Sequence, residues 1–245
     1  MKITQHIPNA FTAANLLCGL TSIILIFHGN LPAAGLLIFI AAVFDYLDGT
    51  AARLLKAYSE LGKQLDSLAD VVSFGVAPGI LVFQMISVNC TSGGNLLERM
   101  HIAPWFAMLI PLCSAFRLAK FNIDLRQETN FIGLPTPANA LFFASIPMIV
   151  GMEGEIFTLI KTGFLTDLLS NTRVLTILAV FFSYLLVSDF RIFSMKFKSL
   201  VWKGNEVRYI FLLISLALLI LFSLSAIPLI IITYLLLSLF MQRYI

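Results

Sequence analysis

Long apolar runs separated by short polar segments fill almost the whole chain. Because roughly 20 apolar residues span a bilayer as a helix, each run predicts a membrane helix. We expect eight helices, over residues 11–28, 32–56, 65–88, 102–120, 136–152, 172–189, 207–224 and 227–243. Pro32, Pro104 and Pro228 lie near helix starts, where a missing amide donor costs little. The pattern therefore predicts an all-α protein, a polytopic transmembrane helix bundle.

Composition supports the same fold class. The 245 residues are 59% hydrophobic and 12% charged, whereas soluble domains are about 45–50% apolar and about 25% charged. A water-soluble fold could not bury that much apolar surface. The sequence has no low-complexity tract and no convincing internal repeat, so we expect a single integral membrane domain over residues 1–245.

Basic residues indicate how the bundle lies in the membrane. If successive helices alternate in direction, thirteen of the 16 Lys and Arg residues fall on one side. These are Lys2, Arg53, Lys56, Lys63, Arg117, Lys120, Arg126, Arg191, Lys196, Lys198, Lys203, Arg208 and Arg243. Cytoplasmic loops carry an excess of such residues, so both termini are expected on the cytoplasmic side of the cell membrane. The net charge of +3 is too small, and too confined to loops, to indicate nucleic-acid binding.

Four aspartates occupy the ends of the second and third predicted helices on this side. Asp45 and Asp48 are three residues apart, so they share one helical face. Asp66 and Asp70, four residues apart, do the same on the next helix. The connection near residues 57–63 is short enough to make the two helices antiparallel neighbours. All four carboxylates are therefore expected to converge on one cavity.

Converging carboxylates require compensation by positive charge or by protons. An aspartate within a membrane helix costs about 2.5–3.5 kcal/mol on insertion scales. Protonation, a neighbouring Arg or Lys, and a bound divalent metal are the alternatives. Oxygen donors without a nearby His or Cys cluster favour hard ions such as Mg²⁺, Mn²⁺ or Ca²⁺. Solvated helix-end charges are the simpler interpretation, but four aspartates at facing spacing favour the metal.

Small residues accompany the first aspartate pair. Asp45, Gly49 and Ala52 run i, i+4, i+7, so small side chains lie above a carboxylate and let a bulky ligand approach. Arg53, one turn beyond Gly49, offers a forked donor for phosphate oxygens. Small residues on membrane helices are also common packing contacts, but their interleaving with carboxylates favours a ligand.

Residues 45 to 70 read D-Y-L-D-G-T-A-A-R-L-L-K-A-Y-S-E-L-G-K-Q-L-D-S-L-A-D. This segment resembles the signature of the CDP-alcohol phosphatidyltransferases, D-x2-D-G-x2-A-R-x8-G-x3-D-x3-D, at all eight fixed positions. The resemblance implies a bundle with a six-helix catalytic core, usually dimeric, here over residues 8–189. Residues 190–245 would then form a basic loop and a two-helix extension.

The resemblance also implies roles for individual residues. The divalent metal would be held by Asp45, Asp48, Asp66 and Asp70, with Asp70 also the general base. The nucleotide and pyrophosphate of CDP-diacylglycerol would be bound near Gly49, Ala52, Arg53 and Gly62. The opening P-N-A-F-T is similar to the start of the first helix in many members, which adds Asn9 and Thr12 to the donor site. Without the resemblance, Asn9 would more simply be a helix N-cap.

Three further segments resemble the serine-using branch of the family: S-F-G-V-A-P-G from Ser73, R-L-A-K-F-N from Arg117 and F-I-G-L-P-T-P-A-N-A from Phe131. They imply transfer of the phosphatidyl group to the hydroxyl of L-serine, with release of CMP. Serine carries a carboxylate and an ammonium, so its pocket needs cations and oxygen acceptors. The candidate residues are Ser73, Arg117, Lys120, Asn122 and Thr136. Lys120 stands where the branch often has Arg, which keeps the charge and loses a bidentate contact.

Other interpretations of these residues remain open. Within the family, the alternatives are phosphatidylglycerophosphate and phosphatidylinositol-phosphate synthases, whose acceptors carry a phosphate. Arg117 and Lys120 are also explained as loop charges, and Ser73 as a hydroxyl that bonds its own helix. A cation-coupled transporter also uses intramembrane carboxylates. The position of this cluster at helix ends, with no matching polar break later in the chain, argues against a transporter.

Overall fold

The structure, a computed structural model, describes residues 6–90, 101–123, 131–151, 163–192, 202 and 205–241. In chain order its elements are α1 (His6–Phe27), α2 (Leu31–Leu54), α3 (Glu60–Asp70), the π-helix η2 (Val71–Val76), α4 (Ala77–Asn89), the 3-10 helix η3 (Ala103–Met108), α6 (Leu109–Ile123), β1 (Phe131–Ile132), α7 (Thr136–Gly151), α8 (Gly163–Ser170), α9 (Thr172–Val187), β2 (Arg191–Ile192), α10 (Glu206–Phe222), the 3-10 turn η5 (Ser223–Ser225) and α11 (Ala226–Met241). The predicted all-α bundle is confirmed. Much of the predicted basic loop after residue 190 lies outside the described residues.

Five helical stretches of the described chain are long and apolar enough to cross a membrane, or six if the bent pair α8 and α9 forms one span. The stretch Glu206–Phe240 counts as one by composition, although η5 divides it into α10 and α11. Helix α7 is apolar but shorter. The chain is therefore a membrane protein, and every predicted helix has a counterpart in the structure.

The third predicted helix begins earlier than expected, at Glu60 instead of residue 65. The hydroxyl of Ser59 accepts a 3.0 Å hydrogen bond from the backbone N–H of Gly62 and so caps the first turn. From Glu60 the helical rod continues for 30 residues to Asn89. Its π-helical segment ends at Val76, two residues before Pro78, which has no N–H to donate to the preceding turn.

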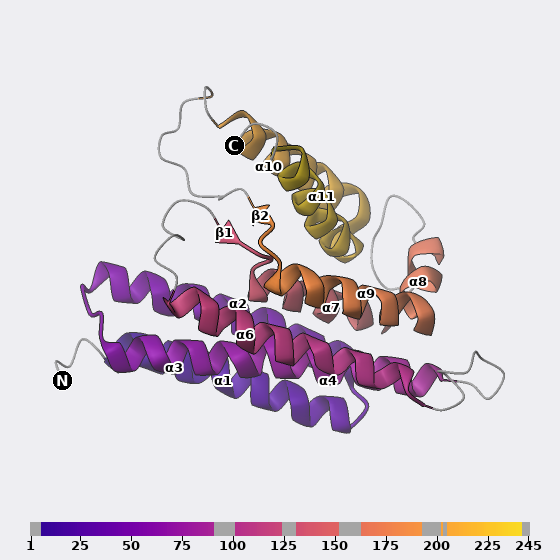
Figure 1. Cartoon of the computed structure of the whole chain (residues 1–245), viewed down its shortest axis with the longest axis horizontal. Coiled ribbons are helices and arrows are strands. Elements are labelled where there is room, and N and C mark those ends of the chain that lie inside the picture. The colour runs from indigo at the N-terminus through magenta and orange to yellow at the C-terminus, as the bar shows by residue number, and fades with distance from the viewer. Residues whose placement is uncertain are drawn as a thin grey trace.

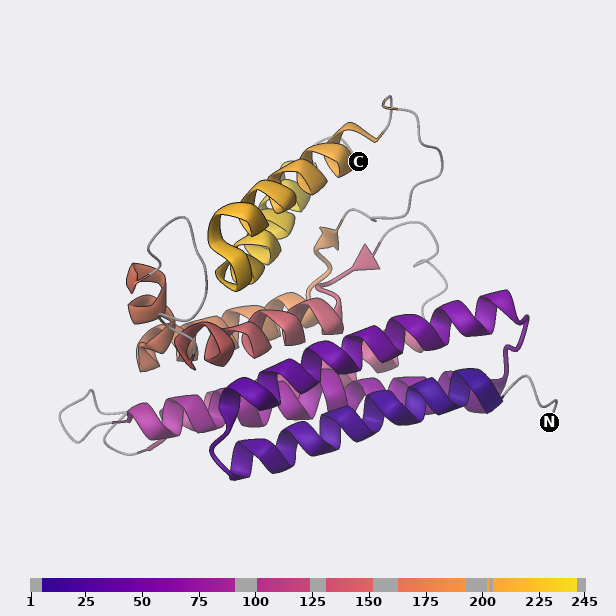
Figure 2. The same ribbon diagram turned by 180° about the vertical axis from the view of Figure 1, so that it is seen from behind.

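The helices form a layer of long helices that is covered on one face by shorter ones. Helices α1, α2, α3–α4 and α6 run alongside one another, α7 and α9 lie on them, and α10 and α11 lie beyond (Figures 1 and 2). The rings of Phe142, Phe143 and Phe182 join α7 to α9, with centroids 4.2 to 5.6 Å apart. All three side chains are buried, so they form part of the hydrophobic core.

Helix α1 approaches the π-helix η2 very closely. A Cβ on Gly19 would lie 2.8 Å from the Cα atom of Ser73, so only glycine permits this contact. The Ser73 hydroxyl donates a 3.0 Å hydrogen bond to the backbone carbonyl of Asn15 across the same interface. The contact places the polar face of α1 against the segment that contains Asp70.

A short antiparallel pairing of β1 with β2, absent from the sequence prediction, ties the start of α7 to the end of α9. The N–H of Gly133 donates to the carbonyl of Phe190 at 2.8 Å, and the N–H of Leu134 donates to Leu185 at 3.0 Å. Gly133 has φ +77, which favours glycine. This pairing fixes where α7 begins, at Thr136.

Helices α10 and α11 fold back on one another as an antiparallel hairpin (Figures 1 and 2). The rings of Phe211 and Tyr234 meet across it with centroids 5.5 Å apart. Helix α11 also packs against α7 and β2. The 3-10 turn η5 packs against α7 as well, so the hairpin is attached to the rest of the bundle through α11 and η5.

Candidate active site

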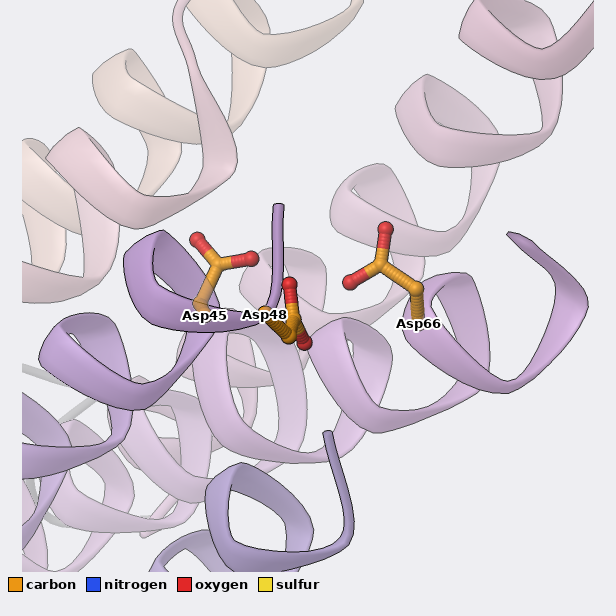
Figure 3. A group of neighbouring side chains, drawn as sticks. All are labelled: Asp45, Asp48 and Asp66. Atoms are coloured by element: carbon orange, nitrogen blue, oxygen red, sulfur yellow. The ribbon is translucent and has the colours of Figure 1, made fainter. Parts of the chain in front are cut away.

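Asp45, Asp48 and Asp66 point toward one another from two helices (Figure 3). Each offers one carboxylate oxygen, and these three oxygens all lie within 4.8 Å of one another. The pair on α2 shares one face because of its three-residue spacing, and α3 presents Asp66 opposite them. The predicted convergence therefore holds for these three carboxylates.

The donor set of this cluster fits a divalent cation. Asp48 is buried, and Oδ1 of Asp66 is buried with no hydrogen-bond partner. A buried acceptor without a donor is costly, and three carboxylates this close repel one another. Oxygen ligands suit hard ions such as Mg²⁺ and Mn²⁺. A metal bound by Asp45, Asp48 and Asp66 would satisfy both the charge and the unpaired oxygen.

Asp70 lies outside the group of three. Its side chain is 8% exposed, and its Oδ1 accepts a 3.2 Å hydrogen bond from Nδ2 of Asn15. It is close enough to the other carboxylates to interact with them electrostatically. The structure thus separates a cluster of three potential ligands from a fourth carboxylate held by an amide.

Helix α1 provides the groups that orient this site. The hydroxyl of Thr12 donates to Oδ2 of Asp48 at 2.7 Å, and Asn15 holds Asp70. Thr12, Asn15 and Gly19 recur at i, i+3 and i+7 along the buried face of α1. One face of α1 therefore orients Asp48 and Asp70, and the same face makes the close contact with Ser73.

A cavity of about 520 Å³ opens beside the three carboxylates. It is lined by Pro8, Asn9, Thr12, Asp48, Gly49, Ala52, Ala57, Tyr58, Ser59, Glu60, Gly62, Lys63 and Asp66. Five of the six residues expected at the donor site are among them: Asn9, Thr12, Gly49, Ala52 and Gly62. A Cβ on Gly49 would meet no atom within 4 Å, so this glycine leaves the cavity open.

Arg53 is the exception among the expected donor-site residues. Its Nε donates to the carbonyl of Gly49 at 3.0 Å, and its Nη2 donates to the hydroxyl of Thr50 at 3.3 Å. The side chain is exposed and folds back along α2, so it does not line the cavity. A phosphate-binding role would require a different side-chain rotamer.

Arg117 and Thr136 are the predicted acceptor residues that the structure brings together in the interior. Nη1 of Arg117 donates to the Thr136 hydroxyl at 3.3 Å, with the two side chains 7% and 0% exposed. The guanidinium lies 5.8 Å from the ring centroid of Phe121, and it is within electrostatic range of Asp70. This buried cation therefore stands on the Asp70 side of the bundle.

The other three predicted acceptor residues are engaged elsewhere. Ser73 bonds the backbone of Asn15. Lys120 forms an exposed 2.9 Å ion pair with Asp189, and Asn122 donates to the hydroxyl of Ser67 at 2.8 Å. The contacts of Lys120 and Asn122 tie α6 to the end of α9 and to α3. The structure thus separates Arg117 and Thr136 from the rest of the predicted set.

Two asparagines of this region were absent from the sequence-based set of site residues. Asn15 is fully buried and holds Asp70, while its own Oδ1 has no partner among the described residues. Asn139, one turn after Thr136, is also fully buried, and neither of its amide atoms has a partner there. The polar residues Thr12, Asn15 and Ser22, at i, i+3 and i+10 on one face of an otherwise apolar helix, could have identified Asn15.

Curated proteins with similar sequences are named for one activity or for a close variant of it. A CDP-diacylglycerol–serine O-phosphatidyltransferase of Bacillus subtilis is 38% identical over 133 residues, 54% of this chain and 70% of that protein. One of Mycobacterium leprae is 37% identical over 145 residues, 56% of this chain and 45% of that protein. An archaetidylserine synthase of Methanothermobacter thermautotrophicus is 37% identical over 148 residues, 59% of each. The chain thus spans about half of the latter two relatives.

The family model for CDP-alcohol phosphatidyltransferase matches residues 5–185 of the chain. The matched region contains all four aspartates, Thr12, Asn15 and every residue that lines the cavity. It also contains the buried pair of Arg117 and Thr136, and it ends near the end of α9. From this match over most of its length, the chain belongs to the CDP-alcohol phosphatidyltransferase family.

Proposed function

We propose that this chain transfers the phosphatidyl group of CDP-diacylglycerol to the hydroxyl of L-serine, releasing phosphatidylserine and CMP. The observation that carries the proposal is the arrangement of three clustered carboxylates, a cavity beside them and a fourth, separately held carboxylate. The names of the relatives favour serine as the acceptor.

In this proposal the cavity receives the nucleotide and pyrophosphate of the donor. Thr12 keeps the carboxylate of Asp48 oriented, and Gly49 leaves space for the ligand. Lys63 lines the same cavity and supplies a positive charge for a phosphate oxygen. Asp45, Asp48 and Asp66 would hold Mg²⁺ or Mn²⁺, which when bound neutralises pyrophosphate charge and stabilises the departing CMP.

Asp70 acts as the general base. The carboxylate removes the proton of the serine hydroxyl while the serine oxygen bonds to the phosphorus that carries the lipid. The bond from that phosphorus to the bridging oxygen breaks, and its electron pair leaves with CMP. Asn15 keeps Oδ1 of Asp70 in place, so the other oxygen is available for the proton.

Arg117 provides the cation for the serine carboxylate. It is buried and already bound to Thr136, and its Nε has no partner among the described residues. A guanidinium matches the two oxygens of a carboxylate. Its electrostatic proximity to Asp70 would bring the serine hydroxyl toward the base.

We place the site on the cytoplasmic side of the membrane. The end of α2, the start of α3 and the end of α6 lie toward the same end of the bundle (Figure 1). They carry Arg53, Lys63 and Lys120 respectively, which supports this orientation under the positive-inside rule. Exposed apolar side chains such as Leu17 and Leu213 would contact membrane lipids, and we retain the homodimer implied by the family as part of the proposal.

Purified protein in lipid nanodiscs tests the acceptor directly. CDP-diacylglycerol and Mg²⁺ or Mn²⁺ are supplied with labelled L-serine, glycerol 3-phosphate or inositol phosphate in separate reactions. The proposal expects labelled lipid from serine, with one CMP released per lipid formed. A lipid product from another acceptor and none from serine would contradict it.

A further inference from the structure

Four buried polar side chains lie where α6 meets the start of α7. Ser114 and Arg117 are one turn apart on α6. Thr136 and Asn139 are one turn apart on α7. All four are buried, and Arg117 at 7% is the most exposed of them. The 3.3 Å hydrogen bond from Nη1 of Arg117 to the Thr136 hydroxyl joins the two helices at this point.

Helices α6 and α7 pack against each other and run in opposite directions (Figure 1). Asn139 follows Thr136 by three residues, and Ser114 precedes Arg117 by three. Because the joined pair is Arg117 and Thr136, the antiparallel course brings Asn139 to the level of Ser114. The four side chains therefore form one polar cluster, in two steps along the helix pair.

Two contacts fix how α6 lies along the rod of α3 and η2. Nδ2 of Asn122 donates to Oγ of Ser67 at 2.8 Å. Further along, a Cβ on Gly75 would lie 3.1 Å from Cβ of Ser114, so the backbone of η2 comes close to α6 there. The two contacts are equally far apart in sequence on the two partners, and the partners run in opposite directions (Figure 1). One antiparallel register therefore holds between them.

This register places the polar cluster beside the proposed general base. Arg117 is level with Val72, two residues from Asp70, which is about 3 Å along the axis at a rise of 1.5 Å per residue. Asn139 is level with Gly75, about one turn further from Asp70. Along the bundle, the order is therefore Asp70, then Arg117, then Asn139.

Three members of the cluster keep polar atoms that have no hydrogen-bond partner in the part of the chain that the structure describes. These atoms are Oγ of Ser114, Nε of Arg117, and both Oδ1 and Nδ2 of Asn139. The backbone N–H of Asn139 is already bonded to the carbonyl of Pro135 at 3.1 Å. A buried amide with no partner destabilises a fold, so its presence beside an unpaired guanidinium nitrogen indicates a polar ligand.

We propose that Asn139 is a specificity-determining residue, which receives the ammonium group of the acceptor amino acid. An ammonium group only donates hydrogen bonds, and so does the guanidinium of Arg117, so those two groups cannot pair. The amide oxygen of Asn139 is an acceptor that lacks a donor. Asp70 would then face the hydroxyl of serine, Arg117 its carboxylate and Asn139 its ammonium. This inference rests on the proposed function, because it assigns a further group of the same substrate.

Kinetics of Asn139→Leu test the proposal in the full-length protein. The variant replaces the amide by an apolar side chain of similar size. Because hydrogen bonds to charged groups are among the stronger ones, KM for serine should rise by about tenfold. The kcat and the KM for CDP-diacylglycerol should stay within about twofold of wild type. Ser145→Ala is the matched control on α7, since Ser145 is also buried but bonds the carbonyl of Phe142, and it should leave all three constants unchanged.

A substrate analogue separates recognition of the ammonium from a general structural effect. In wild type and in Asn139→Leu, 3-hydroxypropionate competes with labelled serine; it keeps the hydroxyl and the carboxylate and lacks the ammonium. Its inhibition constant should stay within about twofold, because it offers nothing to the Asn139 oxygen. Asn139→Ala, which adds no bulk, is measured in parallel and should give the same pattern.

Three outcomes would overturn the inference. They are an unchanged KM for serine in both variants, equal losses with serine and 3-hydroxypropionate, and failure of both variants to fold, which would show that the amide serves the fold. Failure of the wild-type protein to use serine at all would instead contradict the proposed function. The two kinds of failure are therefore distinguishable in one set of assays.

Discussion

Thr12 on α1 donates a 2.7 Å hydrogen bond to Oδ2 of Asp48 on α2, so the first helix fixes the orientation of a carboxylate in the cluster. The bond is buried and joins residues 36 positions apart. The bonded carboxylate is one of the three whose oxygens lie within 4.8 Å of one another. The hydrogen bond from Thr12 to Asp48 therefore links the position of α1 to the proposed metal site.

Thr12→Val should therefore weaken the metal site. Loss of a hydrogen bond to a charged group costs about 1.5–3 kcal/mol, so the Mg²⁺ or Mn²⁺ concentration for half-maximal activity should rise by about tenfold or more. Titration of activity against metal concentration measures this. Thr21→Val is the control, because Thr21 lies on the same helix, is exposed and bonds only its own helix through Leu17. Equal metal requirements in both variants would contradict the assignment.

Asn15→Leu should slow the chemical step. The variant removes the amide that holds Asp70, and a misplaced base loses much of the 10²- to 10⁴-fold that such catalysis typically contributes, so kcat should fall by about tenfold or more. Binding of CDP-diacylglycerol and of metal should persist, because Asn15 contacts neither the cavity nor the three clustered carboxylates.

Single-turnover measurements at saturating substrate test the role of Asn15. Ser22→Ala is a matched control on α1, since Ser22 is also buried but bonds the backbone of Ala34. A wild-type kcat in Asn15→Leu would show that Asp70 needs no such support.

Gly62→Ala should narrow the donor cavity. An added Cβ would lie 2.9 Å from Oγ of Ser59 and 3.1 Å from Oδ1 of Asn9, so these lining residues must shift. Overpacking typically costs about 1–3 kcal/mol, and KM for CDP-diacylglycerol should rise by about fivefold or more. Gly163→Ala, where an added Cβ meets nothing within 4 Å, is the control. The prediction fails if the two alanine variants bind the donor equally well.

Lys120→Gln should leave serine use nearly unchanged. The Lys120 ammonium pairs with Asp189 at the surface, where both side chains are well exposed, 45% and 82%. Such pairs contribute about 0–1 kcal/mol, so KM for serine should stay within about twofold of wild type. A large rise in KM for serine would show that Lys120 belongs to the acceptor site. Its ion pair with Asp189 would then have to break during turnover.

The periodic features of the sequence predicted most of this fold. Apolar runs indicated the helices, and the three- and four-residue spacings of the aspartates indicated their shared faces. The β1–β2 pairing was not predictable, because two-residue strands have no pattern and their stability depends on α7 and α9 being in place. Ser59 capped α3 earlier than expected because local hydrogen bonding extends the helix beyond its apolar run.

The site residues likewise fall into those that the sequence could predict and those that it could not. Gly49 and the aspartates were identified from their spacing along neighbouring helix turns, and Thr12 from the resemblance of its segment to the family. Arg53 and Lys120 were placed at the site from their motifs and their charge, but a motif does not fix a side-chain rotamer. In the structure Arg53 bonds its own helix and Lys120 pairs with Asp189. The pairing of Asn15 with Asp70 joins helices that are far apart in the sequence, and spacing along one helix cannot reveal it.

In the proposed mechanism three carboxylates hold the metal while Asp70 performs the proton transfer. Asp70→Asn measures this most directly, through the rate of CMP release with CDP-diacylglycerol and serine, alongside Mn²⁺ binding by the same preparation. Because Asp70 lies outside the cluster of Asp45, Asp48 and Asp66, Mn²⁺ binding should persist. CMP release should fall by about 10²-fold or more. Near wild-type CMP release from a variant that still binds Mn²⁺ would contradict the account.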